Sequence, residues 1–141
     1  MFSFPLNATD EQLLMAVDHW IGLLAEERYE EAFKLLYLNS PLDDGWSPDL
    51  IRALVQNYGI SEPCRDGKVH RVTPIAQTSG GRPNPCRMVF RYDDDNGAKG
   101  LEGYIHFDLP LDGEWSDVTA SFDIWRIEDK LVLHLEDMHV L

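Results

Sequence analysis

The chain has 141 residues, and its 25 Asp and Glu side chains outnumber its 12 Lys and Arg, which gives a formal net charge of -13. This length suits one hydrophobic core, so we expect residues 1–141 to fold as a single domain. The negative charge repels nucleic-acid phosphates and anionic lipids, so we expect neither nucleic acid nor a membrane as a partner. A basic protein partner stays open, although an acidic surface also serves solubility alone.

The chain carries no evident targeting or cofactor motif. Its first residues lack a basic region and a sustained apolar stretch, and no window approaches the ~18 apolar residues of a membrane span. Its two cysteines, Cys64 and Cys86, give neither a disulfide framework nor a metal-ligand spacing. We therefore expect a cytoplasmic protein without cofactor or metal. The two thiols could meet in space, but separate surface thiols are the favoured alternative.

Three amphipathic helices are predicted in the first half of the chain. Thr9 to Gln12 has the form of a capping box, and Ser47 followed by Pro48 is a typical helix start. Turns are expected at 39–41 and 43–45, and Gly59 suits the exit of the third helix. The three apolar stripes are Leu13, Val17, Trp20, Ile21 and Leu24; Tyr29, Ala32, Phe33 and Leu36; and Leu50, Ile51, Leu54, Val55 and Tyr58.

The second half changes to short runs with period-two alternation, which predicts an antiparallel sheet of four to five strands. A strand over 69–77 is weakened by Pro74, which cannot donate to a ladder. Alternating strands follow over 87–92 and 101–109, joined by a turn at 93–97, and a last strand pair spans 115–141 with its turn at 127–130. The expected fold class is α+β, with N-terminal helices packed on one face of a curved sheet.

Matching apolar faces gives a register for these strands. It pairs Phe90 with Gly103 and Arg91 with Glu102, which turns Phe90 inward. It also pairs Ile124 with Leu133, Phe122 with Leu135 and Ala120 with Asp137, and it sets Gly103 beside Phe122 and Ile105 beside Ala120. The inner face is then almost wholly apolar, with Asp137 and His139 breaking it near the end of the sheet. On the outer face the expected row is Arg91, Glu102, Asp123 and His134, with Tyr104, Ser121 and Glu136 beside it and Trp125 opposite Val132.

The helical hairpin carries a resemblance to a known family. Trp20 to Leu24, followed by Arg28 to Phe33, resembles the opening of the NTF2-like superfamily, a cone-shaped, cystatin-like α+β fold. The closing residues 116–120 and 135–141 are similar to a family of uncharacterised bacterial proteins, which implies a fold but no activity. The superfamily includes isomerases, dehydratases, ligand carriers and interaction modules, so the site must decide the function.

Two classes of function follow. The favoured one is a non-catalytic protein-interaction module that forms a homodimer through the outer sheet face, or binds a basic partner as an immunity-type protein would; its interface residues are Trp125, Val132, Tyr104 and His134. The alternative is a small-molecule-binding or enzymatic cone, in which Asp137 orients His139 as a general base between apolar walls formed by Trp20, Tyr58 and Ile105. His106, His134 and Glu136 lack a compact metal-ligand motif.

Overall fold

The computed structural model describes residues 1–38, 45–93 and 100–140. The turn predicted at 39–41, most of the one at 43–45 and most of the one at 93–97 lie outside these residues. The described elements are, in chain order, β1 (Phe4–Pro5), α1 (Asp10–Ala25), α2 (Tyr29–Lys34), α3 (Pro48–Gln56), a short 3-10 helix (Ile75–Gln77), β2 (Arg87–Arg91), β3 (Leu101–Leu111), β4 (Glu114–Ile127) and β5 (Lys130–Val140).

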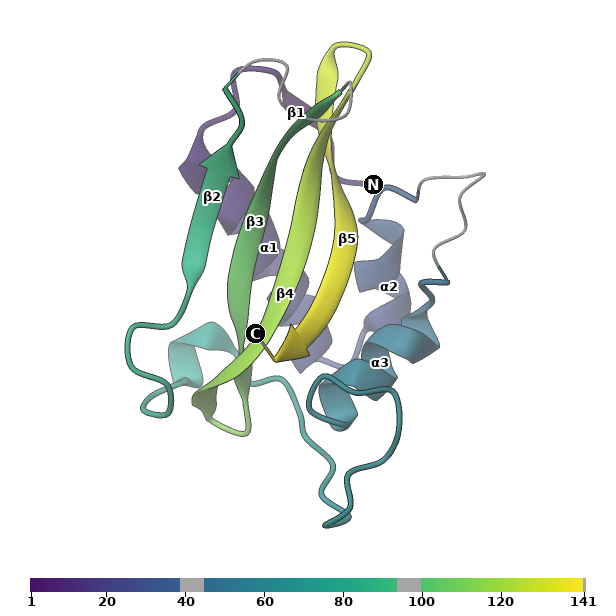
Figure 1. The fold of residues 1–141 in the computed structure, drawn as a ribbon, viewed down its shortest axis with the longest axis vertical. Helices are drawn as coiled ribbons and strands as arrows, with labels where there is room; N and C mark the ends of the chain where they lie inside the picture. Colours follow the sequence, from purple (N-terminus) through teal and green to yellow (C-terminus); the bar gives the residue numbers. More distant parts are fainter. Residues whose placement is uncertain (39–44, 94–99, 141) are drawn as a thin grey trace.

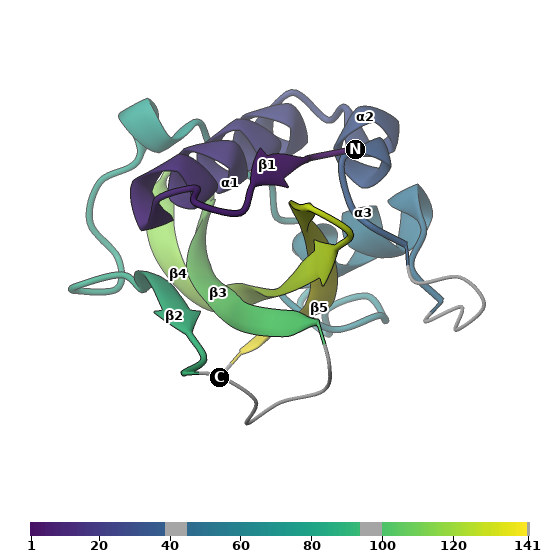
Figure 2. The same ribbon diagram turned by 90° about the horizontal axis from the view of Figure 1, so that it is seen from above.

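The strands form one antiparallel sheet in the order β1-β5-β4-β3-β2. Figure 1 shows the long strands β3, β4 and β5 side by side with the helices behind them, and Figure 2 shows the sheet curving around that side. The predicted fold class, α+β with helices packed on a curved antiparallel sheet, is confirmed. None of the helices in the described parts of the chain is long and apolar enough to cross a membrane.

The helices begin where the capping signals predict. The Thr9 hydroxyl accepts a hydrogen bond from the Gln12 amide at 3.2 Å, and the Gln12 side chain accepts from the Thr9 amide at 2.8 Å. Ser47 caps α3 by accepting from the Leu50 amide at 3.0 Å, with Pro48 at the first helical position. These bonds satisfy amides that have no partner within the helix, and so fix the first turns of α1 and α3.

Large side chains fill the inner face of the sheet. Trp20 of α1 meets Phe122 of β4 edge to face, with ring centroids 5.1 Å apart, and both side chains are fully buried. The Trp20 indole N–H donates to the Ala32 carbonyl at 3.2 Å, so the only polar atom of this ring is satisfied by α2. The space between helices and sheet is therefore a packed core. Its other fully buried large side chains include Leu13, Ile21, Leu24, Ile51, Ile105, Phe107, Leu109, Ile124, Leu131 and Leu133.

The predicted register between β2 and β3 is wrong by one residue. Phe90 pairs with Tyr104, and Arg91 pairs with Gly103, so Met88 and Phe90 lie on the outer face. Arg91 instead points toward α1, where its guanidinium contacts the Asp10 carboxylate at 3.0 Å and donates to the Ala8 carbonyl at 2.9 Å. The ion pair with the first turn of α1 explains why a charged residue occupies the inner side of an edge strand.

Between β4 and β5 the prediction holds until a bulge interrupts it. Ile124 pairs with Leu133 and Phe122 with Leu135, as expected, but a β-bulge follows and the next partner of Ser121 is Asp137. Glu136 is the extra residue, so Ala120 pairs with the buried Met138 and not with Asp137. The predicted inward direction of Asp137 and His139 is therefore wrong.

The β3–β4 register is shifted by two residues from the prediction, which leaves each side chain on its expected face. Ile105 lies opposite Phe122, and Gly103 lies opposite Ile124. The segment 69–77 is not a strand: Val72 makes a single bridge to Leu111, and a 3-10 helix follows Pro74. Pro74 and the helical turn after it prevent a longer ladder.

Candidate functional site

The outer face of the sheet carries a continuous group of aromatic side chains. We use "outer face" for the sheet surface turned away from the helices, formed by Met88, Phe90, Tyr92, Tyr104, His106, Ser121, Asp123, Trp125, Val132, His134, Asp137 and His139. Phe90 stacks on Tyr104 with centroids 5.1 Å apart and an interplanar angle of 18°. Tyr92 lies 5.7 Å from Phe90, and His106 lies 4.8 Å from Tyr104. Four rings from two neighbouring strands therefore form one surface.

This aromatic group is unusual because it faces solvent. Phe90 is 44% exposed and Met88 is 39% exposed, although both belong to the sheet. Among the described residues, no hydrogen bond engages the phenol hydroxyl of Tyr92 or Tyr104. Contiguous exposed apolar area of this kind marks an interaction surface more often than a neutral one.

The other half of the outer face, on β4 and β5, is mostly polar apart from Trp125 and Val132. His134 lies 3.9 Å from the Asp123 carboxylate, measured from its ring nitrogen Nδ1, and the corresponding distance from His139 to Asp137 is 2.6 Å. The second oxygen of Asp137 accepts from the Met138 amide at 2.8 Å, so this carboxylate has a structural role at the bulge. The predicted coupling of Asp137 with His139 is present, but it lies on the outer face and not in a cone.

The predicted interface residues have different environments. Trp125 pairs with Val132 as expected, yet Val132 is only 2% exposed, so its side chain offers little surface to a partner. Tyr104 belongs to the aromatic stack, and its row continues through Asp123 to His134. Arg91, predicted in that row, is absent from it because of the register shift described above.

One end of this surface is covered by the preceding loop. Asp108 and Thr119 are paired on the outer side of β3 and β4, and both are fully buried. The Asp108 carboxylate accepts from the Thr119 hydroxyl at 2.7 Å and from the Cys86 amide at 2.6 Å, and Arg82 lies 3.3 Å away. A buried carboxylate with three such partners fixes the 82–86 segment across the sheet.

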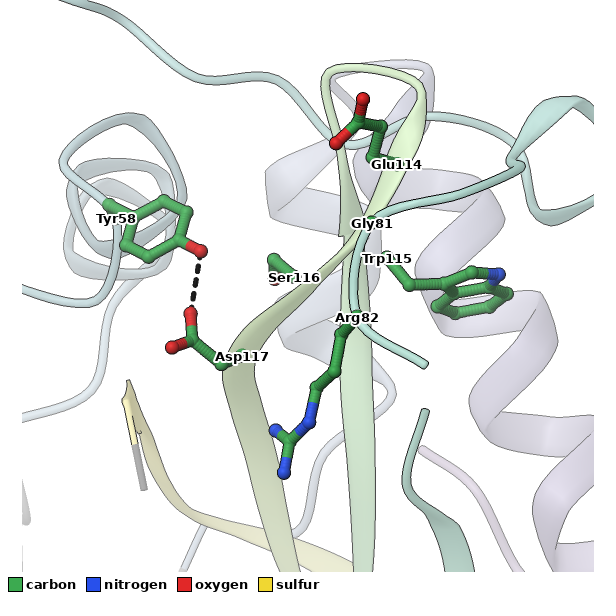
Figure 3. Close-up of a pocket in the computed structure, with 7 residues that line it drawn as sticks. All are labelled: Tyr58, Gly81, Arg82, Glu114, Trp115, Ser116 and Asp117. Carbon is green, nitrogen blue, oxygen red and sulfur yellow. Dashed lines mark hydrogen bonds between the residues drawn. The ribbon is translucent and has the colours of Figure 1, made fainter. Parts of the chain in front are cut away.

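A pocket of about 510 Å³ opens beside Tyr58, at the end of the sheet where β3 turns into β4. We call it the Tyr58 pocket, and its lining residues are Tyr58, Gly81, Arg82, Glu114, Trp115, Ser116 and Asp117. The Tyr58 hydroxyl donates to Asp117 at 2.6 Å, and Figure 3 shows these two groups on one side of the pocket, with the Trp115 indole directed away from them. Burial and the neighbouring Asp117 carboxylate raise the pKa of Tyr58, so its phenol stays a donor at neutral pH.

The turn from β3 to β4 contributes a second oriented pair. Asp112 and Gly113 both have positive φ, the conformation that a two-residue hairpin turn requires. Asp112 accepts from the Arg71 amide at 3.1 Å and contacts Nδ1 of His70 at 2.6 Å. His70 and Asp112 line an adjoining pocket of about 300 Å³ that shares Tyr58, Glu114, Trp115 and Ser116 with the first. The Asp-Gly pair was the sequence signal for this turn, and sequence reasoning did not use it.

The structure does not bring the predicted enzymatic residues together. Trp20 and Ile105 are fully buried in the core, whereas Tyr58 lines the pocket named after it. Asp137 and His139 lie on the outer face, as described above. Among the described residues, no group of three or more His, Cys, Asp or Glu side chains is arranged to hold a metal ion.

Comparison of this chain with protein families, with curated proteins and with solved structures found no match. The function is therefore argued from the geometry of the outer face and of the Tyr58 pocket.

Proposed function

We propose that this chain is a non-catalytic protein-interaction domain that forms a homodimer through the outer face. The observation that carries the proposal is the aromatic stack of the exposed Phe90 with the half-exposed Tyr92 and Tyr104, on a sheet whose inner face is already filled. Large aromatic side chains dominate the binding energy of protein interfaces, and Tyr is among the residues enriched there. A cytoplasmic location and membership of the NTF2-like superfamily remain part of this proposal, supported by the thiol content and by the resemblance of the helical hairpin.

A second copy is the occupant because the two halves of the outer face are complementary. The β2–β3 half offers the phenol hydroxyls of Tyr92 and Tyr104, which are donors, and the β4–β5 half offers the carboxylates of Asp123 and Asp137, which are acceptors. In a face-to-face pair with a two-fold axis parallel to the strands, the β2–β3 half of one copy lies on the β4–β5 half of the other. A two-fold interface requires such self-complementarity.

The enzymatic alternative has less support. Acid-base chemistry needs a polar group in reach of a bound substrate. The inner face, where a cone would hold its substrate, consists of fully buried apolar side chains such as Ile105, Phe107 and Phe122.

Sedimentation equilibrium of the wild-type chain and of Phe90→Ala tests the proposal. The wild type should dimerise, and the variant should have a dissociation constant roughly 30-fold higher, since an interface hot spot contributes about 2 kcal/mol. Val69→Ala is the matched control, because Val69 is 63% exposed and lies outside the sheet. A wild type that stays monomeric at millimolar concentration would refute the dimer.

Salt separates self-association from binding of a basic partner. Two copies that each carry a net charge of -13 repel one another, so added salt should strengthen the dimer by screening this repulsion. A complex with a basic protein would weaken under the same change. If added salt dissociates the dimer, attraction between opposite charges holds it together, and the proposed aromatic interface between two acidic copies is wrong.

A further inference from the structure

The two edges of the sheet differ in how they are covered. Along the β5 edge, β1 pairs with Leu131, and the Tyr37 amide donates to the Leu133 carbonyl at 2.7 Å. The part of β3 that extends beyond β2 is also bonded, because the Thr73 amide donates to the Pro110 carbonyl at 2.9 Å. In the described parts of the chain, no strand, bridge or backbone hydrogen bond covers the far side of β2, the outermost strand in Figure 1. We call this side the β2 edge.

The bonds between β2 and β3 show which backbone groups face the β2 edge. The Cys86 carbonyl accepts from the Asp108 amide at 2.8 Å, and the Tyr92 amide donates to the Glu102 carbonyl at 2.9 Å. Successive residues of an antiparallel strand turn their backbone groups to alternate sides, so the even-numbered residues of β2 face β3. The amides and carbonyls of the odd-numbered residues therefore face the β2 edge. These residues are Arg87, Val89 and Arg91.

The sequence of β2 is nearly symmetric about Val89. Met88 and Phe90 stand on either side of it, and Arg87 and Arg91 stand one residue further out. An antiparallel pair of two copies with its two-fold axis at Val89 places Met88 of one copy opposite Phe90 of the other. The same register sets odd-numbered residues opposite odd-numbered ones, so the open amides and carbonyls of the two edges meet in about six hydrogen bonds. The β2 edge is thus self-complementary, as a two-fold interface requires.

The charges of β2 permit this approach. Inward-pointing charged side chains can protect an edge strand from pairing, and this register sets the two arginines of β2 opposite one another. However, the Arg87 guanidinium lies 2.9 Å from the Asp18 carboxylate and 3.5 Å from that of Glu11. The Arg91 guanidinium lies 3.0 Å from the Asp10 carboxylate. In each copy, α1 therefore supplies three carboxylates to two guanidinium groups, so the arginines that meet across the axis are already neutralised.

We propose that the β2 edge binds the β2 edge of a second copy, in an antiparallel pair centred on Val89 that joins two sheets into one. An exposed strand edge is a template for another strand, and β2 contains neither proline nor lysine, which commonly protect such edges. The β2 edge binds through backbone groups that lie between the two faces of the sheet. Its pairing therefore stands or falls separately from the proposed contact between outer faces, and a chain that uses both forms assemblies larger than a dimer.

The first test is an isotope-filtered NOE measurement on a mixture of 13C-labelled and unlabelled protein, which detects only contacts between copies. The Hα proton of Met88 should give a cross-peak with that of Phe90, because residues that do not exchange hydrogen bonds have the closest backbones in an antiparallel pair. Within one chain these two protons lie two residues apart on the same strand and do not meet. A different pair of residues, or no contact between copies at β2 at millimolar concentration, would overturn the proposal.

Hydrogen exchange of the backbone amides separates the β2 edge from the outer face. When the protein concentration rises, exchange at Arg87, Val89 and Arg91 should slow by roughly 10-fold, because these amides gain partners only in the pair. Exchange at Met88 and Phe90 should change much less, since their amides already face β3. A contact between outer faces covers both sets alike. Equal slowing at odd and even positions, or no slowing at Val89, would contradict pairing at the β2 edge.

One variant connects association to this edge. Val89→Pro removes an outward amide and leaves the bonds to β3 in place, so it should weaken edge pairing about 10-fold or more. Val69→Pro is the matched control, since Val69 is 63% exposed and lies outside the sheet.

Sedimentation equilibrium compares these two variants with the wild type. With Val89→Pro, assemblies larger than a dimer should become dimers held by the outer face, or a dimer held by the β2 edge alone should become a monomer. Association unchanged by Val89→Pro, or weakened equally by Val69→Pro, would overturn the proposal. If Val89→Pro does not fold, the NOE and exchange measurements on the wild type still decide.

Discussion

The two faces of the sheet have similar apolar content along some strands but very different surroundings. On the inner face Phe122 is fully buried against Trp20, whereas on the outer face Phe90 is 44% exposed and stacks only on neighbouring rings. Side-chain type alone does not distinguish these two positions. The difference teaches that an alternating apolar pattern identifies a face, and that the elements packed on it decide whether this face is core or interface.

The largest expected effect comes from truncating a matched ring on each face. Phe122→Ala should lower the free energy of unfolding by about 3–5 kcal/mol, because it leaves a cavity in the packed core. Phe90→Ala should lower it by less than about 1 kcal/mol in the monomer, since the ring is already partly in water. Urea unfolding of both variants at low concentration measures the difference. Equal losses would mean that Phe90 is part of the core.

The next effect contrasts a buried and a half-exposed carboxylate on the same side of the sheet. Asp108→Asn should cost about 1–3 kcal/mol of unfolding free energy, because the amide NH2 that replaces one carboxylate oxygen faces a donor, either the Thr119 hydroxyl or the Cys86 amide. Asp137→Asn should cost less than about 1 kcal/mol, since its pair with His139 is open to solvent. Thermal unfolding of the two variants compares them. A small effect of Asp108→Asn would show that the 82–86 segment is held by other contacts.

A smaller effect is expected for Trp125, at the edge of the outer face. Trp125→Ala should weaken the dimer by about 2 kcal/mol, roughly 30-fold in the dissociation constant, if its indole is an interface anchor. Its control is Met15→Ala, because Met15 is 60% exposed on α1, on the far side of the core. Light scattering over a concentration series gives both constants. If both variants dimerise like the wild type, the interface does not extend to Trp125.

The smallest effect concerns Glu136 and depends on pH. Partial burial of its carboxyl group, followed by repulsion from Asp123 and Asp137, raises the pKa of Glu136. A raised pKa in the folded state means that the proton stabilises the fold; this stability is complete at acid pH and is lost as pH rises through the folded pKa. Glu136→Gln should therefore raise the melting temperature slightly at neutral pH and have no effect at acid pH. Destabilisation by Glu136→Gln at neutral pH would contradict this sign.

The helices were predictable from the sequence because their signals are local. Capping residues such as Thr9 and Ser47 bond to amides three residues away, and the stripes repeat within a few turns. The last strand pair was also predictable up to Phe122 and Leu135, since a short turn joins its strands. In these parts the decisive contacts lie close together along the chain.

The remaining features depend on contacts between distant residues. Phe90 turns outward because Arg91 binds Asp10, which lies 81 residues away in the chain. The Tyr58 pocket needs α3, the β3–β4 turn and the 79–82 segment at one place, and Tyr58 reaches Asp117 across 59 residues. A period-two pattern of apolar residues contains no information on contacts between residues far apart in the chain. Matching the apolar faces of the strands therefore predicted the wrong face for Phe90.

The bulge at Glu136 adds one residue to β5 and so shifts the in-and-out alternation of the residues that follow it by one position. With Glu136 in place, the buried apolar residues of the inner face fall at Leu131, Leu133, Leu135 and then Met138. Without it, they would fall at every second position, and each side chain would keep its present face. A chain shortened by this one residue should therefore fold to the same arrangement with a straighter last strand, because a bulge bends the strand that contains it.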